Sequence, residues 1–193
     1  GQHLAQTTQA DLSEFEAIRW TAQCASPDLP LTITAFTLAV TAAALKKFPQ
    51  FNASLDEARK EVILKRYINI GVAVDTPLGL TVPVITAADR KSVRTLAYEI
   101  ANLTSKIRSN ILTNKNLYRI YFTITNLGEC GGTAFIPAVN FPEVSILGLS
   151  RSAIAPTYVN GVCKPRPLLP LSLSYDPQLI NDVDGIRFLR WLT

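Results

Sequence analysis

The sequence predicts an α+β fold, a two-layer sandwich of helices on a mixed β-sheet, in one domain spanning residues 1–193. Helical and strand-like segments are mixed without the regular period of a βαβ protein. An almost wholly apolar stretch, 34–48, predicts a helix buried on most sides and ended by Pro49. Apolar residues recurring at helical spacing over 93–107 predict an amphipathic helix packed on a sheet. A chain of 193 residues suits one sizeable core better than two.

The remaining elements are predicted from caps, turns and β-rich runs. Asp11, with Glu14 three positions later, predicts a helix that begins at Asp11 and stops near Pro27. The pair Asn160-Gly161 predicts a tight hairpin turn. Strands are expected at 3–8 (an edge strand), 62–67, 68–74, 80–85, 121–126, 144–149, 155–159 and 169–175, before a closing helix over about 184–191.

Composition limits the function classes. Hydrophobic residues make up 48% of the chain and charged residues only 18%, which predicts a surface partly covered by other subunits. The net charge of +4 comes from scattered basic residues, so nucleic-acid binding is not expected. Three cysteines without a CxxC pair and a single histidine predict no metal site. No signal peptide or membrane span is recognisable, so we expect a cytoplasmic protein.

Three long segments, in this order, carry a family resemblance. They are YINIGVAVDTPLGLTVPV (67–84), FTITNLG (122–128) and LPLSLSYD (169–176), supported by 52–55 and 142–148. Together they resemble the catalytic domain of the bacterial dihydrolipoyl acetyltransferases, which form the core of 2-oxoacid dehydrogenase complexes. The resemblance implies a trimer with a chloramphenicol acetyltransferase-like fold and a cytoplasmic, bacterial setting.

The resemblance also implies a reaction, acyl transfer between coenzyme A and a dihydrolipoyl thiol, with no metal. A base must take the thiol proton because a thiol is mostly protonated at neutral pH, and a donor must stabilise the oxyanion that follows. In the family the base is the histidine of an Asp-His-Arg-x-x-Asp/Asn-Gly motif. The oxyanion donor is the serine of a Thr-Ile-Ser-x-Leu-Gly loop on a neighbouring subunit.

This sequence departs from both motifs. Asp176 is kept, but Pro177 stands at the position of the catalytic histidine, and Gln178 replaces the arginine. Asn181 matches its motif position, whereas Asp182 replaces the glycine. In the second motif, Thr125 stands where the family has serine, and its hydroxyl can still donate. By resemblance the candidate catalytic positions are therefore Thr125, Asp176, Pro177 and Asn181.

Each candidate also has a purely structural interpretation. Taken alone, Thr125 reads as an ordinary strand threonine, and Asp176-Pro177 reads as a turn. His3, the single imidazole, is a conceivable replacement base, although a lone histidine near a terminus is more often exposed or packed. The glycines of 128–132 lack a following Lys-Ser/Thr and predict a tight backbone turn rather than a phosphate loop.

Three functional hypotheses remain open. The first is the core of a pyruvate-type acetyltransferase, with position 177 altered, misassigned or functionally replaced; the chain contains no methionine, which keeps misassignment open. The second is a catalytically inactive, acyltransferase-like scaffold subunit. The third, chloramphenicol acetyltransferase, needs the same histidine and ranks last. The resemblance implies a homotrimer that can build a 24-subunit cubic core. It also implies that the dehydrogenase and dihydrolipoyl dehydrogenase components bind through domains expected to be absent here, as are the lipoyl domains. No residues are assigned to the pantetheine arm.

Overall fold

The computed structural model describes residues 3–77, 79–109 and 122–193. Within these ranges the main sheet has the strand order β1-β10-β8-β7-β4-β5, with β6 paired to β4 and β9 to β10. β7 runs parallel to β4 and β8, whereas the other pairs are antiparallel, so the sheet is mixed. The strands are β1 (Leu4–Asp11), β4 (Ile70–Thr76), β5 (Gly79–Thr81), β6 (Val84–Ile85), β7 (Phe122–Asn126), β8 (Ser145–Leu149), β9 (Ala153–Val159) and β10 (Val162–Tyr175).

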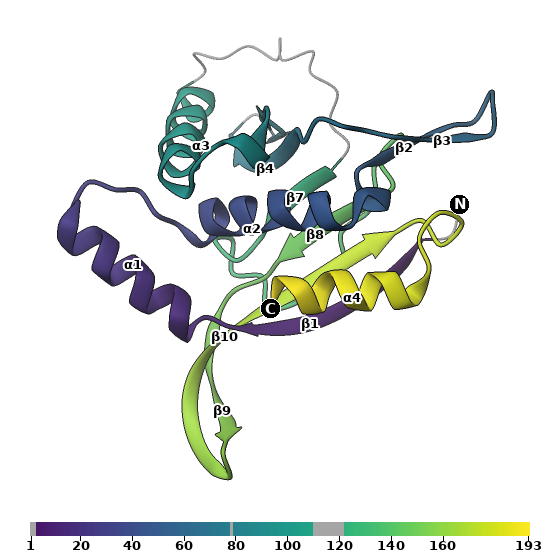
Figure 1. Ribbon diagram of the computed structural model, residues 1–193. Coiled ribbons are helices and arrows are strands. Elements are labelled where there is room, and N and C mark those ends of the chain that lie inside the picture. The colour runs from purple at the N-terminus through teal and green to yellow at the C-terminus, as the bar shows by residue number, and fades with distance from the viewer. Residues whose placement is uncertain (1–2, 78, 110–121) are drawn as a thin grey trace.

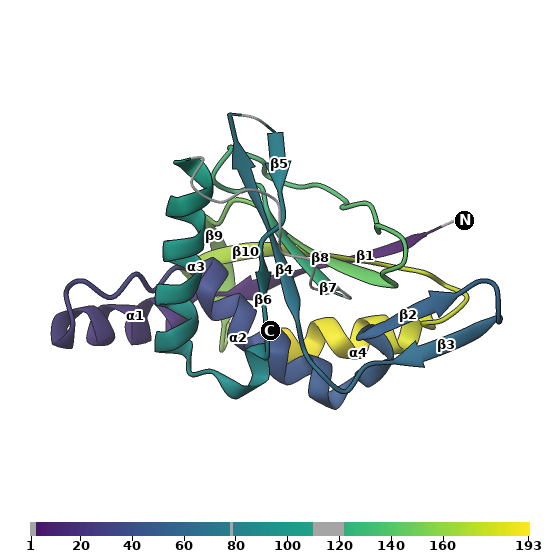
Figure 2. The ribbon, with the colours of Figure 1, turned by 90° about the horizontal axis from the view of Figure 1, so that it is seen from above.

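Helices cover one face of this sheet. Figures 1 and 2 show α2 and α4 on the same side of the central strands, with α3 beside α2. The helices are α1 (Ser13–Ala25), α2 (Ile33–Lys47), α3 (Val93–Arg108) and α4 (Asp182–Leu192), with two short 3₁₀ turns, η1 (Pro49–Phe51) and η2 (Ala88–Arg90). The predicted α+β sandwich with a mixed sheet is confirmed.

Phe188 of α4 stands at the centre of the core between the two layers. Its ring centroid lies 4.4 Å from that of Phe51, 5.8 Å from that of Phe48 and 5.9 Å from that of Phe122 on β7. Aromatic pairs at these separations add attraction beyond the area they bury. The core therefore joins α2, its 3₁₀ extension, α4 and the middle of the sheet.

The opposite face of the central strands carries mostly small and polar side chains, with Ile146 of β8 as an exception. Phe122 and Ile124 of β7 belong to the core, and because side chains alternate along a strand, Thr123 and Thr125 point away from it. On β10, Leu171, Leu173 and Tyr175 face the core, while Ser172 and Ser174 lie on the opposite side and are nevertheless buried. We call this the outer face of the sheet.

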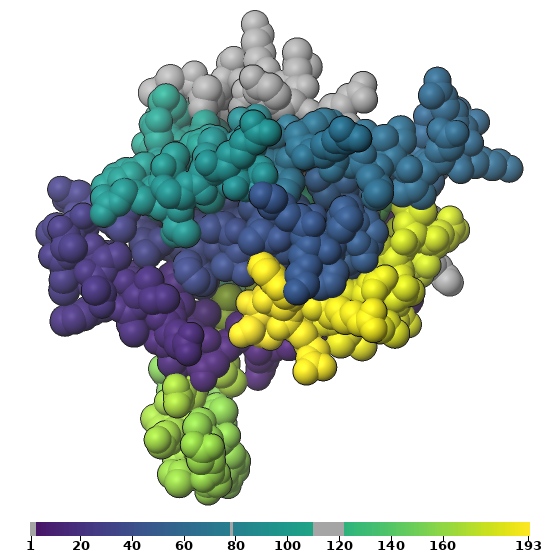
Figure 3. Space-filling model, viewed as in Figure 1, coloured from purple at the N-terminus to yellow at the C-terminus, as the bar shows by residue number. Residues whose placement is uncertain are grey.

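Two hairpins project from the body. One is formed by β9 and β10 and extends away from the rest of the molecule in Figures 1 and 3. Its turn contains Asn160 and Gly161, both with positive φ, as the predicted tight hairpin requires. The other pairs β2 (Ala53–Asp56) with β3 (Glu61–Leu64).

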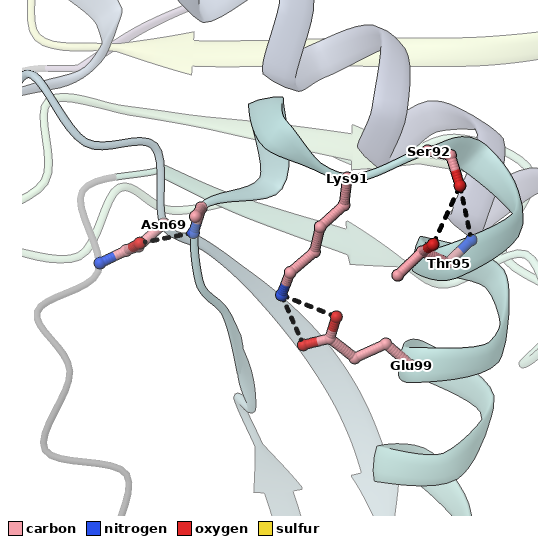
Figure 4. A network of polar contacts seen from close by, with 6 residues as sticks. Asn69, Lys91, Ser92, Thr95 and Glu99 are labelled. Carbon is pink, nitrogen blue, oxygen red and sulfur yellow. Dashed lines mark hydrogen bonds and ion pairs between the residues drawn. The ribbon is translucent and has the colours of Figure 1, made fainter.

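Polar contacts fix the segment that enters α3 (Figure 4). Ser92 caps the helix by accepting a hydrogen bond from the Thr95 amide, and Lys91 pairs with Glu99 at 2.7 Å. Asn69 Oδ1 accepts from the amide of Ala87, whose φ of 47° is left-handed. The first two contacts lie within the start of α3 and the residues just before it, and the third ties the loop after β6 to the residue that precedes β4.

Two of the wrong boundary predictions have a clear cause in the backbone hydrogen bonding. The first helix begins at Ser13, not Asp11, because Asp11 is the last residue of β1 and Leu12 still donates to the Pro167 carbonyl. Asp11 Oδ1 instead accepts from the Ser13 amide and hydroxyl, which lowers the pKa of the Asp11 carboxyl. The predicted strand 80–85 is two strands, because Pro83 has no amide hydrogen to donate.

Other elements differ in length. β10 begins seven residues before the predicted strand 169–175, and the carbonyls of its Pro167 and Pro170 accept backbone hydrogen bonds from Leu12 and Ser150. The short strand β2 was not predicted, and α4 begins at Asp182 rather than 184. The predicted strand 121–126 is confirmed as β7, except for Tyr121, which lies outside the described residues.

Candidate functional site

The bend between β10 and α4 carries three of the four candidate residues. Asp176 donates its amide to the Val144 carbonyl at 2.9 Å, and its own carbonyl accepts from the Leu179 amide at 3.1 Å. That second bond closes a β-turn with Asp176 first and Pro177 second, the positions that each residue type favours. Asp176 Oδ1 also accepts from the Gln178 amide at 2.9 Å. The structural interpretation of Asp176-Pro177 as a turn is therefore confirmed.

Asn181 ends the bend by capping α4. Its Oδ1 accepts from the Asp184 amide at 2.8 Å, and its Nδ2 donates to Asp184 Oδ2 at 3.0 Å. A cap of this kind contributes about 1 kcal/mol to a helix. Both polar atoms of Asn181 are thus engaged within the subunit.

Behind the bend, three side chains form a polar clamp that sequence reasoning missed. The Tyr175 hydroxyl donates to Asp182 Oδ1 at 2.7 Å, and Gln6 Nε2 donates to both the Tyr175 hydroxyl and the Asp182 carbonyl. We call Gln6, Tyr175 and Asp182 the clamp. Its one visible signal was Asp182 in place of the glycine of the family motif. The clamp ties α4 to β10 and to the edge strand β1.

Thr125 lies on the outer face near the end of β7 and is 9% exposed. Its register neighbours are small, Ala73 on β4 and Gly148 on β8. A Cβ at Gly148 would lie 2.7 Å from the Phe135 ring, so the segment that covers this strand requires glycine there. The hydroxyl of Thr125 therefore sits in a narrow, nearly closed space.

The turn that follows β7 is tight, as predicted for 128–132. Gly132 donates to the Leu127 carbonyl at 3.1 Å, and Gly131 has a φ of 86°. A cavity of about 680 Å³ opens beside this turn, and its lining includes Thr34, Ala73, Thr104, Arg108 and Asn126. The cavity thus reaches the residue next to Thr125 and the strand partner of Thr125.

One subunit does not bring Thr125 to the bend. Thr125 is in register with Gly148, which is in register with Ser172, four residues before Asp176. The two positions are therefore separated by roughly 13 Å along the strands and about 10 Å across them. Asp176, Pro177 and Asn181 lie together, whereas Thr125 stands near the other end of the sheet.

Sequence reasoning also missed Glu143, a buried ionisable group on the outer face. Thr123 donates to Glu143 Oε1 at 2.7 Å, while Oε2 is buried and has no hydrogen-bond partner among the described residues. Burial raises the pKa of the Glu143 carboxyl to about 7, although the bond from Thr123 works against this shift. A glutamate following a proline in a loop gives no signal of such burial in the sequence.

His3 is exposed and immediately precedes β1. Among residues 3–77, 79–109 and 122–193, no group of three or more His, Cys, Asp or Glu side chains is arranged to hold a metal ion. In the same ranges, no helix has the length and apolar character needed to cross a membrane. Cys24, Cys130 and Cys163 are exposed thiols without disulfide partners.

Comparison with known proteins identifies the relatives of this chain. The family model for the catalytic domain of the 2-oxoacid dehydrogenase acyltransferases matches residues 2–193. The dihydrolipoyllysine-residue acetyltransferase component of the pyruvate dehydrogenase complex from Pseudomonas aeruginosa is 43% identical over 192 residues, covering 98% of this chain and 35% of that protein. Its counterpart from Azotobacter vinelandii is also 43% identical over 192 residues, covering 98% of this chain and 30% of that protein. The chain therefore spans about a third of the length of these curated relatives.

Solved structures agree with this relationship. One, from an investigation of the catalytic roles of a serine, a histidine and an asparagine in the Azotobacter vinelandii dihydrolipoamide acetyltransferase, superposes with a TM-score of 0.93 at 43% identity, covering 99% of this chain and 79% of that one. The cubic core of a pyruvate dehydrogenase complex also gives 0.93 at 43% identity, with coverage of 98% and 79%. A chloramphenicol acetyltransferase, 10% identical with a TM-score of 0.62 and coverage of 98% and 86%, shares the fold alone. The expected fold and family are confirmed: the chain belongs to the 2-oxoacid dehydrogenase acyltransferases and matches their catalytic domain.

Proposed function

We propose that this chain is the core domain of a dihydrolipoyl acetyltransferase of the pyruvate dehydrogenase complex. It would transfer an acetyl group between a dihydrolipoyl thiol and coenzyme A, and it would form the oligomeric scaffold of the complex. One observation carries the proposal. In the Azotobacter vinelandii enzyme the histidine follows the serine by 52 residues and the asparagine follows the histidine by four, and the same separations join Thr125, Pro177 and Asn181. The spacing of the three positions is thus kept even where the residue type differs, which supports the proposal.

The geometry supports a site shared between subunits. Because Thr125 and the bend lie near opposite ends of the sheet in one chain, a thioester cannot contact both unless a second copy supplies one of them. In the proposed arrangement Thr125 of one copy donates to the oxyanion, and the 176–181 bend of the next faces the reacting thiol. The nearby cavity is lined by Ala73 and Asn126, the strand partner and the chain neighbour of Thr125, but not by Thr125 itself. No described residue is assigned to the pantetheine arm.

The proposal includes assembly and location. A shared site needs at least two copies, and the likeness to a cubic core supports a homotrimer and a 24-subunit assembly of trimers. The dehydrogenase and dihydrolipoyl dehydrogenase components would bind through other domains of the full protein. Relatives from bacteria and the exposed, unpaired cysteines support a bacterial cytoplasmic setting.

A second function, that of a catalytically inactive scaffold subunit, is favoured by a specific observation. Pro177 has no proton-accepting atom, and the bend that holds it is closed by the β-turn, the Asn181 cap and the clamp. Loss of a general base lowers a rate by roughly 10²–10⁴-fold. A subunit with this bend could keep its place in the trimer without contributing chemistry.

An assay separates the two functions. The purified protein is mixed with acetyl-CoA and dihydrolipoamide, and loss of the thioester is followed beside the Pro177→His variant. Turnover by the unmodified chain, or a gain of at least ~10²-fold in the variant, supports the acetyltransferase. If neither protein turns over substrate although both form trimers by light scattering, the scaffold function stands and the enzyme proposal fails.

A further inference from the structure

β1 brings the only histidine of the sequence to the bend that lacks a base. The first residue of β1, Leu4, is in register with Tyr175, the last residue of β10. Continuing the antiparallel register by one residue places His3 opposite Asp176, which immediately precedes Pro177. Figures 1 and 2 agree in placing the N-terminal end of β1 at the edge of the molecule where β10 turns into α4.

His3 and Asp176 also share a face of the sheet. Gln6 points toward α4, where it donates to Asp182, so alternation puts His3 on the outer face. Tyr175 lies in the core, so Asp176, the next residue, likewise belongs to the outer face. Directly opposed residues on one face of an antiparallel pair have Cβ atoms about 4.5–5.5 Å apart. Extending the register beyond Leu4 and Tyr175 thus points the His3 imidazole and the Asp176 carboxylate toward each other next to Pro177, although no hydrogen bond or ion pair joins them in the structure.

Neither side chain is committed elsewhere. The His3 ring has no hydrogen bond or ion pair with a described residue, and Asp176 uses only Oδ1, to accept from the Gln178 amide. The other ionisable groups nearby are engaged: Asp182 faces the helices and bonds Tyr175, and Glu143, next to the strand partner of Asp176, bonds Thr123. Asp176 is thus the carboxylate available to orient the imidazole.

We propose that His3 is the catalytic base of this chain, oriented by Asp176 and acting in place of the side chain missing at Pro177. This inference rests on the proposed acetyl transfer. The imidazole takes the proton of the attacking thiol, and the thiolate sulfur bonds the thioester carbonyl carbon. The oxyanion accepts from Thr125 of a neighbouring copy. When the tetrahedral intermediate collapses, the original C–S bond breaks and the departing thiolate recovers the proton from the imidazolium, so no proton is gained or lost overall.

The test is a kinetic comparison of the assembled protein with its His3→Asn variant, using acetyl-CoA and dihydrolipoamide over pH 5.5–9. His3 is exposed, so the variant is expected to fold, which light scattering and urea unfolding verify. We expect kcat to fall at least ~10²-fold with KM changed less than about twofold, and the pH-dependent limb of the rate to disappear. Gln9→Asn, further along the same face of β1, is the matched control and keeps the rate and pH profile of the parent.

A second pair of variants separates this inference from the proposed function. Pro177→His is combined with His3→Asn, and the pair is expected to recover activity because the motif base no longer depends on β1. If His3→Asn alone is as active as the parent, His3 is not the base, although the chain is an enzyme. If the parent is inactive and Pro177→His is active, the His3 proposal fails while the acetyltransferase proposal stands. If all variants are inactive, both fail.

Discussion

The Tyr175 hydroxyl donates a 2.7 Å hydrogen bond to Asp182 Oδ1 across the bend that joins β10 to α4. Gln6 Nε2 donates to the same hydroxyl at 2.8 Å, which adds the edge strand to the contact. Burial and the bond to Asp182 raise the pKa of Tyr175 to about 12, so the hydroxyl keeps its proton at ordinary pH. The Asp176–Asn181 bend begins directly after Tyr175 and ends directly before Asp182. Because these two residues are bonded to each other, the clamp fixes the positions of both ends of the bend.

We expect Tyr175→Phe and Asp182→Ala each to lower the free energy of unfolding by about 1 kcal/mol, because each removes one side of a part-buried hydrogen bond. The double variant should cost less than the sum, since the second change removes a group that the first has already orphaned. Urea unfolding of the four proteins measures the coupling. Tyr158→Phe is the control, because Tyr158 is 80% exposed. Strictly additive losses would show that the clamp does not act as a unit.

Gly185→Ala sets the higher helix propensity of alanine against the crowding of an added methyl group. The sign of the change in the free energy of unfolding shows which effect is larger. Alanine in a helix interior is ordinarily favoured over glycine by about 1 kcal/mol. A Cβ at Gly185, however, would lie 3.0 Å from the fully buried Tyr175 ring and 3.2 Å from Gln6 Oε1. Because the ring is held in the core, we expect a net loss of roughly 1–3 kcal/mol, measured as a lower urea midpoint. A more stable variant would mean that the Tyr175 ring can shift to make room for the added methyl group.

Much of the fold was predictable because hydrophobic periodicity is a local property. The apolar run 34–48 and the amphipathic run 93–107 correspond to α2 and α3 within about one residue at each end. Boundaries set by tertiary pairing were not predictable. β1 continues through Asp11 because β10 pairs with it, and this pairing overrides the local capping signal of Asp11 and Glu14.

In the candidate site, too, local features were predictable from the sequence and long-range contacts were not. The resemblance gave the candidate positions Thr125, Asp176, Pro177 and Asn181 and implied that Thr125 acts from a neighbouring subunit, but no sequence pattern gives the distance within one subunit. That separation follows from strand order, a long-range property. The clamp and the buried Glu143 were missed for the same reason, since their partners are 7 to 176 residues apart in the sequence. Sequence identifies residue types, and the register of the sheet identifies their neighbours.

The raised pKa of the Glu143 carboxyl predicts how the free energy of unfolding depends on pH. Burial raises the pKa of its carboxyl from 4.5 to about 7 in the folded chain, so folding favours the protonated form. The contribution of the protonated Glu143 carboxyl to the free energy of unfolding is therefore fully present below pH 4.5 and is lost as the pH rises through 7. Urea unfolding at fixed protein concentration measures the free energy of unfolding of the parent and of Glu143→Gln. We expect the difference between them, in favour of the variant, to be roughly 1–3 kcal/mol larger at pH 8 than at pH 5. Glu57→Gln, at an exposed position, is the control. Parallel pH curves for all three proteins would contradict the raised pKa.

Thr125 is expected to act through its hydroxyl alone. In protein carrying Pro177→His, Thr125→Val keeps the shape of the side chain in its closed space but removes the donor, so kcat should fall by roughly 10²–10³-fold with little change in KM. Thr125→Ser restores the donor and should retain the parental rate. Thr7→Val, an exposed threonine on β1, is the matched control for removing a strand hydroxyl. Steady-state rates with acetyl-CoA and dihydrolipoamide make the comparison. If the valine variant turned over like the parent, the oxyanion would be stabilised by another group, and the alternation that places Thr125 on the outer face would have no catalytic consequence.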